Sequence, residues 1–254
     1  MRILYVVGIG PGGREDMTLR AAEALRQADL IVGYDRYVEI IRREFEDDEQ
    51  IAASEFYSTG MTREIERCRY ALGRADEGTS TALICSGDAG IYGMASPVLE
   101  LAPEYPKVCI RIIPGVTAAS SGAALAGAPL SHDFSVISLS DRLTPWELIE
   151  KRLKAAALSD MTIVLYNPSS HGRPDTLKKA AGILMDAGLP EDRVCALARH
   201  IGREGEEAVI STLGRLPYEM CDMQTTVFIG SSSSYTDKKR MITPRGYKKD
   251  REKA

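Results

Sequence analysis

The fold is decided near the start of the chain, by the stretch ILYVVGIGPGGREDMTLRAAEAL at residues 3–25. Its first part, Ile3–Ile9, is an apolar run of strand length that leads into the glycine-rich turn Gly8–Gly13. Small and apolar residues then recur at helical spacing from Met17 to Ala28. A strand, a glycine turn and a helix in this order predict a βαβ unit.

The same alternation continues outward through the first half of the chain and predicts a parallel sheet. Further strands are expected at Leu30–Gly33, Thr79–Cys85 and Val108–Ile113, with an amphipathic helix between Ile65 and Leu72. Pro114-Gly115 then predicts a turn into a closely packed helix of small residues. We place a domain boundary there, which gives an N-terminal α/β domain at 1–115 and a C-terminal α/β domain at 116–254.

The second half is expected to form a mixed sheet, because its predicted strands follow one another more closely. These strands are Phe134–Leu139, Met161–Tyr166, Arg193–Ala198, Ala208–Leu213 and Thr225–Ile229, with a helix at Thr176–Ala187. A further helix is expected to start at a capping box, with Thr144 as the N-cap, Pro145 at the first helical position and Glu147 at the third.

Composition is that of a folded globular protein. The chain has 254 residues, of which 44% are hydrophobic and 27% charged. It has no apolar run near the roughly 20 residues that span a bilayer, so no membrane partner and a cytoplasmic location are expected. The net charge is −4, but the segment 238–254 carries eight Lys/Arg and two Asp/Glu, so it is +6 and the remainder is −10. This tail lacks the interleaved aromatics of a nucleic-acid site, and a solvated tail or attraction of a polyanionic ligand is expected instead.

Five cysteines and three histidines offer no local metal-binding spacing, because no two cysteines are closer than 17 residues. No metal site is therefore predicted, although one assembled only by folding stays open. Cys85 and Cys109 lie in apolar runs, and we expect both to be buried thiols.

The turn Gly8–Gly13 matches the G-x-G-x-x-G pattern of dinucleotide sites. Glu15 and Asp16 would repel a pyrophosphate at the following helix start, and Pro11 removes one N–H donor. These features count against NAD or FAD. A glycine turn with a purely structural role is the other interpretation.

A second candidate, SGDAGIYG at Ser86–Gly93, follows a buried strand at the sheet edge where α/β folds place ligands. Asp88 offers an acceptor for hydroxyls or an ammonium group. Alternatively, its carboxylate binds the backbone of its own turn.

Taken together, these segments resemble a known family. GIGPG at Gly8–Gly12, TLRAA at Thr18–Ala22, SGDAGIYGMA at Ser86–Ala95 and IPGVTA at Ile113–Ala118 resemble the tetrapyrrole methylases, which use S-adenosylmethionine. Three further blocks resemble the branch that methylates C17 of precorrin-3B or cobalt-precorrin-3 in cobalamin biosynthesis. They are SLSDRLTPW at Ser138–Trp146, LYNPSS at Leu165–Ser170 and MITPRGY at Met241–Tyr247.

The resemblance implies two α/β domains with the cofactor in the cleft between them, usually in a homodimer. Matched by position, it implies two groups of cofactor-binding residues. The first is Pro11, Gly87, Asp88, Ile91, Tyr92, Thr117 and Ala118, and the second is Tyr166, Asn167, Ala198, Arg199, Thr226 and Val227. Ala89 departs from the family, which often has proline there.

Methyl transfer from a sulfonium donor needs alignment more than a nucleophile. In this branch the transfer accompanies ring contraction and closure of a lactone, which needs proton transfer. Candidates in the matching blocks are Asp88, Ser138, Ser140, Asp141 and Asn167. The alternatives are a methylase acting at another carbon, an NAD-binding oxidoreductase and a tetrapyrrole carrier.

Two histidine pairs stay ambiguous. His132-Asp133 is either a base with its orienting carboxylate or a solvated pair, and Arg199-His200 either binds a substrate carboxylate or ends a strand.

Overall fold

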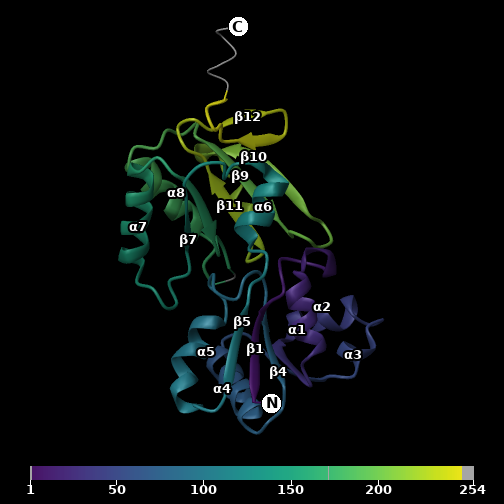
Figure 1. Cartoon of the computed structure of the whole chain (residues 1–254). Coiled ribbons are helices and arrows are strands. Elements are labelled where there is room, and N and C mark those ends of the chain that lie inside the picture. The colour runs from purple at the N-terminus through teal and green to yellow at the C-terminus, as the bar shows by residue number, and fades with distance from the viewer. Residues whose placement is uncertain (1, 171, 248–254) are drawn as a thin grey trace. The chain divides into compact units, whose positions relative to one another are not determined.

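A computed structural model describes residues 2–170 and 172–247 (Figure 1). The chain divides into two compact units, Met1–Ala118 and Ala119–Ala254. Each unit has its own sheet and its own core.

The first unit is built on a five-stranded parallel sheet with strand order β3-β2-β4-β1-β5. The strands are β1 (Ile3–Gly8), β2 (Leu30–Tyr34), β3 (Glu55–Thr59), β4 (Thr81–Cys85) and β5 (Cys109–Ile113). The α-helices are α1 (Leu19–Arg26), α2 (Asp35–Glu44), α3 (Glu49–Ala52), α4 (Glu64–Asp76) and α5 (Ala95–Leu101). Two short 3-10 turns, η1 (Arg14–Asp16) and η2 (Ala102–Glu104), complete the unit.

Helices cover both faces of this sheet, so the sheet's central strands are continuous apolar runs in the sequence. Strand β1 is an example. Tyr5 and Val7 point into the cluster formed with α1, α2 and α3. Leu4 and Val6 point into the opposite cluster, which α4 and α5 cover. Alternation along the strand therefore supplies two cores at once.

All four strands expected in this unit are present within two residues of their predicted ends. The pattern assigned nothing between residues 33 and 65, where the structure has α2, α3 and the edge strand β3. Cys109 was expected to be buried and is exposed. The reason is that β5 lies at the sheet edge, where its side chains are only partly covered.

The second unit contains a mixed sheet with order β10-β9-β11-β8-β7. Its strands are β7 (Phe134–Ser138), β8 (Thr162–Tyr166), β9 (Val194–Arg199), β10 (Glu207–Thr212) and β11 (Thr225–Ile229). Only β7 and β8 are parallel, and the other neighbours are antiparallel. Short turns η3 (Leu213–Arg215) and η4 (Tyr218–Met220) lead into β11.

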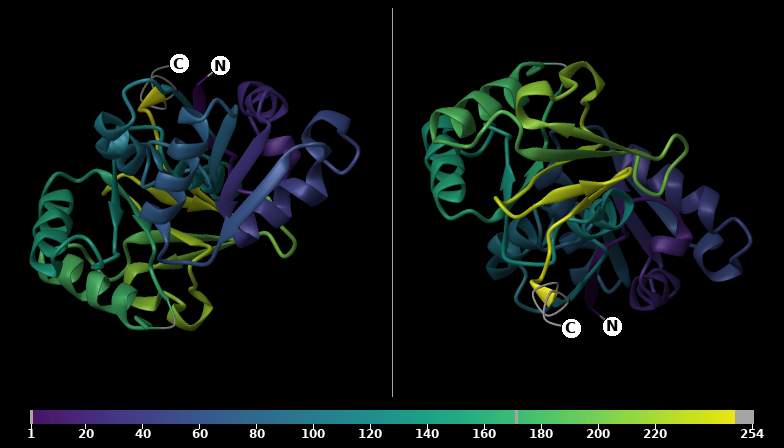
Figure 2. Two further views of the ribbon diagram at one scale, coloured as in Figure 1. Left: turned by 90° about the horizontal axis from the view of Figure 1, so that it is seen from below. Right: turned by 90° about the horizontal axis from the view of Figure 1, so that it is seen from above.

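Helices cover both faces of the second sheet. On one face α7 (Trp146–Leu158) and α8 (Thr176–Asp186) lie side by side over an apolar core (Figure 2). On the other face α6 (Ala118–Ala126) packs so closely that a Cβ on Gly122 would lie 3.1 Å from the Ala198 Cβ. The run of small residues thus allows close approach of helix and sheet.

The expected capping box is wrong. Helix α7 begins at Trp146, and Pro145 is its N-cap with no side-chain hydrogen bond. Pro145 has ψ 141°, an extended conformation, so the helix starts one residue later than expected and Thr144 lies outside it.

In the described part of the predicted tail, Lys238, Lys239, Arg240 and Arg245 are solvent-exposed as expected, but the backbone is folded. Strands β12 (Tyr235–Asp237) and β13 (Arg240–Ile242) form a hairpin, and β13 pairs with β6 (Gly127–Ala128). Met241 is fully buried. The other four basic residues of the segment, Lys248, Lys249, Arg251 and Lys253, lie outside the described residues.

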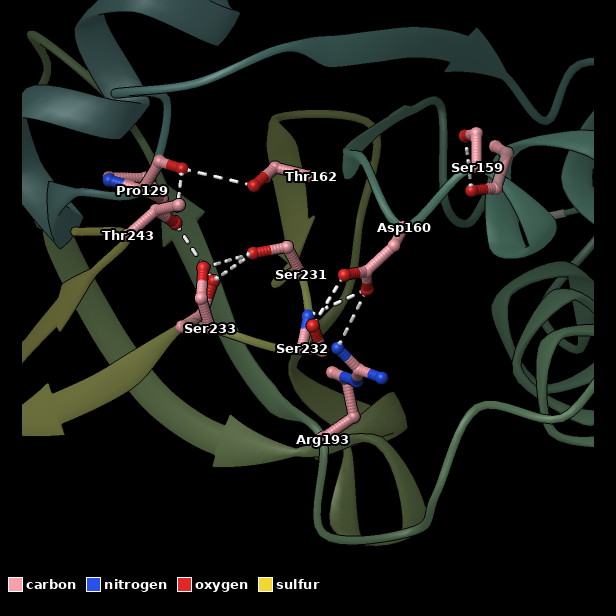
Figure 3. Close-up of polar contacts among 11 residues, drawn as sticks. Pro129, Ser159, Asp160, Thr162, Arg193, Ser231, Ser232, Ser233 and Thr243 are labelled. Carbon is pink, nitrogen blue, oxygen red and sulfur yellow. Dashed lines mark hydrogen bonds and ion pairs between the residues drawn. The ribbon is translucent and has the colours of Figure 1, made fainter. Parts of the chain in front are cut away.

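Hydroxyl groups hold this hairpin to the sheet (Figure 3). The carbonyl oxygen of Pro129 accepts hydrogen bonds from Thr162 Oγ1 at 3.1 Å and Thr243 Oγ1 at 2.7 Å. Thr162 is the first residue of β8. The hairpin therefore lies at the opposite end of β8 from Tyr166, the predicted cofactor residue.

Among the described residues, no helix combines the length and apolar character needed to cross a membrane.

Candidate functional site

Three loops gather at the carboxyl edge of the first sheet. Strand β1 lies between β4 and β5, so the segments after Gly8, Cys85 and Ile113 are neighbours. Gly10 and Gly87 exchange backbone hydrogen bonds of 3.1 Å and 2.8 Å. The GIGPG and SGD motifs, at least 74 residues apart in sequence, therefore form one backbone structure.

Glycine is required where these loops touch. A Cβ on Gly115 would lie 2.1 Å from the Gly87 carbonyl oxygen and 2.5 Å from that of Gly8. A Cβ on Gly8 would lie 2.6 Å from the same Gly87 oxygen. Because these neighbours are backbone atoms, they cannot move aside as a flexible side chain would.

Asp88 orders this assembly with its carboxylate. Oδ1 accepts hydrogen bonds from the backbone N–H of Gly90 at 2.8 Å and Ile91 at 3.1 Å, and Oδ2 accepts one from Gly115 N–H at 3.0 Å. The backbone-binding alternative is therefore the one observed, and it extends to the neighbouring loop. Ile91 and Tyr92, the next predicted cofactor residues, are exposed.

The glycine turn lacks the setting of a dinucleotide site. Helix α1 starts only at Leu19, where Thr18 Oγ1 accepts from Ala21 N–H and caps the helix. The η1 turn separates this helix start from Gly8–Gly13. A pyrophosphate cradle needs the helix to open directly from the glycines. Pro11 is buried within the turn.

The second unit also brings its predicted residues to one sheet edge. Ser138 pairs with Tyr166 where β7 and β8 end, and Arg199 pairs with Thr225 where β9 ends and β11 begins. Ala198 faces the same way as its partner Thr226. Val227 is fully buried in the core under α7 and α8, so only its backbone can reach a ligand.

Tyr166, at this edge of the sheet, also contacts the start of helix α6. Its hydroxyl oxygen accepts a 2.6 Å hydrogen bond from Ala119 N–H, one of the amides that a helix start leaves without an internal partner. Thr117 and Ala118, both half-buried, stand at this helix start.

Four of the five proposed proton-transfer candidates lie together. Ser138 Oγ accepts hydrogen bonds from Asn167 Nδ2 at 2.9 Å and Ser140 N–H at 3.2 Å. An Arg173 guanidinium nitrogen donates to Ser140 Oγ at 3.2 Å and to Asp141 Oδ1 at 2.8 Å. Asp88 belongs to the other unit.

Sequence reasoning missed Arg173. No motif contains it, and the only available signal was a basic residue shortly after the LYNPSS block.

Backbone strain also marks the predicted segments. Tyr92, Asn167 and His200 have φ of 54°, 55° and 51°, values that side chains other than glycine rarely adopt. Such strain is retained when the surrounding structure enforces it and tends to cluster at functional sites. His200 Nε2 lies 3.6 Å from Asp222 Oδ2, while Arg199 pairs with Glu207. The pair His132-Asp133, in contrast, is exposed.

A hollow of about 480 Å³ adjoins this edge of the second unit. One wall is Ser169, Ser170 and Pro174, and the other is Cys221–Gln224. Burial raises the pKa of the Cys221 thiol to about 11, so the cysteine is not a ready nucleophile. The described residues contain no cluster of three His, Cys, Asp or Glu side chains arranged to hold a metal ion.

Comparison with known proteins fits these motifs. A sequence profile of the Tetrapyrrole (Corrin/Porphyrin) Methylases matches residues 3–217. The chain belongs to the tetrapyrrole methylases. Within this family the methylase is 46% identical over 246 residues to a Salmonella typhimurium protein named "Probable cobalt-factor III C(17)-methyltransferase", covering 96% of this chain and 99% of the relative. It spans only 45% of a longer Priestia megaterium relative, a "Cobalt-factor III methyltransferase" to which it is 43% identical.

Solved structures agree with the fold of the methylase. The methyltransferase CobJ superposes with a TM-score of 0.87 at 35% identity, covering 95% of this chain and 99% of that one. A Thermus thermophilus uroporphyrin-III C-methyltransferase complexed with S-adenyl homocysteine has a TM-score of 0.67 at 22% identity, covering 89% and 96%.

Proposed function

We propose that this methylase transfers a methyl group from S-adenosylmethionine to C17 of a cobalt-containing or metal-free precorrin-3 macrocycle, with ring contraction, in cobalamin biosynthesis. The observation that carries the proposal is the 46% identity to the Salmonella typhimurium relative over nearly the whole of both chains. The name of that relative favours the cobalt-containing substrate, cobalt-factor III.

The open backbone at the carboxyl edge of the first sheet supports the proposed site for the methyl donor. Gly87 has φ 67°, and a Cβ there would find only the Thr117 Cα, at 4.0 Å. The backbone of the SGD loop is therefore open on one side, where a small molecule has room to approach it. We propose that the first group of cofactor-binding residues takes the methionine and ribose part of the donor and the second group its adenine side, with the chain boundary between the domains near residue 115.

The chemistry asks the protein mainly for alignment. The C17 carbon displaces the sulfonium leaving group in line, which forms a C–C bond, breaks a C–S bond and leaves S-adenosylhomocysteine. Holding the reacting atoms about 3 to 3.5 Å apart supplies several kcal/mol of the barrier reduction. For the lactone step, we propose that the Ser138–Asn167 cluster moves protons, since Asp88 already accepts three backbone hydrogen bonds.

The test is incubation with methyl-labelled S-adenosylmethionine and either cobalt-factor III or metal-free precorrin-3B, followed by mass analysis of the product. We expect one added label at C17 and a contracted ring with the cobalt substrate. Label at another carbon would show that the enzyme methylates a different position of the macrocycle. Binding of the macrocycle without transfer would identify a carrier and reject the enzyme.

We also propose that the enzyme is a cytoplasmic homodimer, as the family resemblance implies. Light scattering of the purified chain tests the dimer, and a mass near the 27.8 kDa of one chain would contradict it.

A further inference from the structure

Arg173 is held in place by its backbone as well as by its side chain. Its N–H donates to the Ser170 carbonyl oxygen at 2.8 Å, and Ser170 N–H donates back at 3.4 Å. Its own carbonyl oxygen accepts from Thr176 Oγ1 at 3.0 Å, at the start of α8. The guanidinium therefore stands on a closed turn anchored to a helix.

Toward the described residues, the guanidinium forms side-chain hydrogen bonds through one edge alone. A single nitrogen donates to both Ser140 Oγ and Asp141 Oδ1, and the side chain is 23% exposed. An arginine has five N–H donors in a fixed fork. Several of them therefore remain available after these two contacts with described residues. No buried Arg173 nitrogen is left without a partner, so the remaining donors face solvent.

Ser140 adds a donor beside them. Its hydroxyl oxygen accepts from Arg173, which leaves the hydroxyl hydrogen to donate elsewhere. A planar fork next to a hydroxyl donor matches a carboxylate, which accepts two parallel hydrogen bonds from arginine and a third from a neighbour. Asp141, the carboxylate paired with Arg173, is 46% exposed and contacts only one nitrogen of the guanidinium.

We propose that Arg173 and Ser140 bind one peripheral carboxylate of the tetrapyrrole and thereby select the substrate's orientation. This inference rests on the proposed function, because it takes the substrate to be a macrocycle with acetate and propionate side chains. The position agrees with that role: Arg173 stands at the carboxyl ends of β7 and β8, and its loop forms one wall of the 480 Å³ hollow. Arg173 is thus a specificity-determining residue distinct from the proton-transfer candidates Ser138 and Asn167.

The test measures affinity separately for the two ligands in wild type, Arg173→Gln and Arg173→Lys. For cobalt-factor III, followed by its visible absorption, Arg173→Gln should weaken binding by about 10-fold to 100-fold, the range for a lost charge-assisted hydrogen bond. Lysine should restore part of this affinity, because it keeps the charge and loses the fork. S-adenosylhomocysteine affinity, measured by calorimetry, should not change, and the loss in turnover should appear in KM rather than kcat.

Arg69→Gln is the matched control, since Arg69 pairs with exposed Glu104 on the first unit and should leave both affinities unchanged. Equal affinity of wild type and Arg173→Gln for cobalt-factor III, with S-adenosylhomocysteine binding intact, overturns the inference and leaves the proposed methylation standing.

A second probe separates the two proposals. If wild type does not methylate cobalt-factor III, the proposed function fails, and uroporphyrin III, another polycarboxylate tetrapyrrole, replaces it as the probe. Weaker uroporphyrin III binding by Arg173→Gln, with weaker salt dependence than wild type, then supports the carboxylate site. Unchanged binding rejects it.

Discussion

Gly115 has no room for any side chain, because carbonyl oxygens of two other loops stand where its Cβ would be. Gly115→Ala should lower the free energy of unfolding by about 3 kcal/mol or more, since backbone atoms must separate. It should also weaken S-adenosylhomocysteine binding in calorimetry. Gly182→Ala is the control: it lies inside α8 with no atom within 4 Å of the added Cβ, and should stabilise by about 0.5 to 1 kcal/mol in urea unfolding. Wild-type stability of Gly115→Ala would contradict the packing described.

From the sequence alone, the carboxylate of Asp88 could either bind a ligand or accept hydrogen bonds from the protein backbone. Both roles use the same carboxylate oxygens and the same flanking glycines, so no local pattern separates them. Only the arrival of Gly115 from another strand settles which donors surround it. Arg173 escaped prediction for a similar reason, because its partners Ser140 and Asp141 are more than 30 residues away in sequence.

Among the secondary-structure elements, those with strong apolar patterns were predicted closely, as with β11, whose bounds Thr225–Ile229 match the expectation. Strand β3 was missed because it is an edge strand of mostly half-exposed residues, and its run EFYST lacks a core-facing alternation. Helix α2 was missed because acidic and basic residues make up half of DRYVEIIRRE or more. Its buried residues Val38 and Ile41 pack in the core on one face of the sheet.

Asp160, in the turn between α7 and β8, binds Ser232 in the loop that follows β11, and the strength of this contact depends on pH. Asp160 (φ 52°) accepts hydrogen bonds from the N–H of Ser232 at 2.7 Å and from its hydroxyl, and from Arg193 at 3.3 Å (Figure 3). Burial opposes ionisation, but the hydrogen bonds from Ser232 and the charge of Arg193 outweigh it and hold the pKa of Asp160 below its ordinary value. The stabilisation is therefore complete above pH about 4 and lost as pH falls through the lowered native pKa.

Asp160→Asn should accordingly cost about 1 kcal/mol or less at pH 7, because the carboxylate is half-exposed. The difference from wild type should shrink as the pH of the urea titration is lowered below about 4. Asn tolerates the positive φ, so the backbone is preserved. Asp192→Asn, at an exposed carboxylate, should change neither value. An Asp160→Asn deficit that persists undiminished at acid pH would show that ionisation is not its source.

Over the whole molecule, the order of motifs along the chain predicted the family and the α/β class, while strand order was beyond reach of the sequence. Periodicity marks β1 and β4 as buried strands but does not tell that β1 inserts between β4 and β5. That insertion is what gathers the three glycine loops. The hairpin β12–β13 was likewise hidden, since its three-residue strands lie among charged residues.

Thiol reactivity tests burial across both units. Cys109 should react with iodoacetamide at pH 8 well before the buried Cys68, Cys85 and Cys195. Burial raises the pKa of Cys68 to about 12 and that of Cys85 to about 11, so little thiolate is present. Peptide mass spectrometry locates the label, and the same reaction in concentrated urea should modify all five cysteines. Cys85 labelled as fast as Cys109 in the native protein would contradict this sheet arrangement.

The sole tryptophan of the chain, Trp146, opens α7 and packs on the core of the second unit. Its emission therefore reports on one half of the protein. Far-ultraviolet circular dichroism follows helices of both halves. If the two units unfold at different temperatures, tryptophan emission follows only the second unit and circular dichroism follows both. A circular-dichroism transition without a matching change in emission then reports the unfolding of the unit that carries the glycine loops.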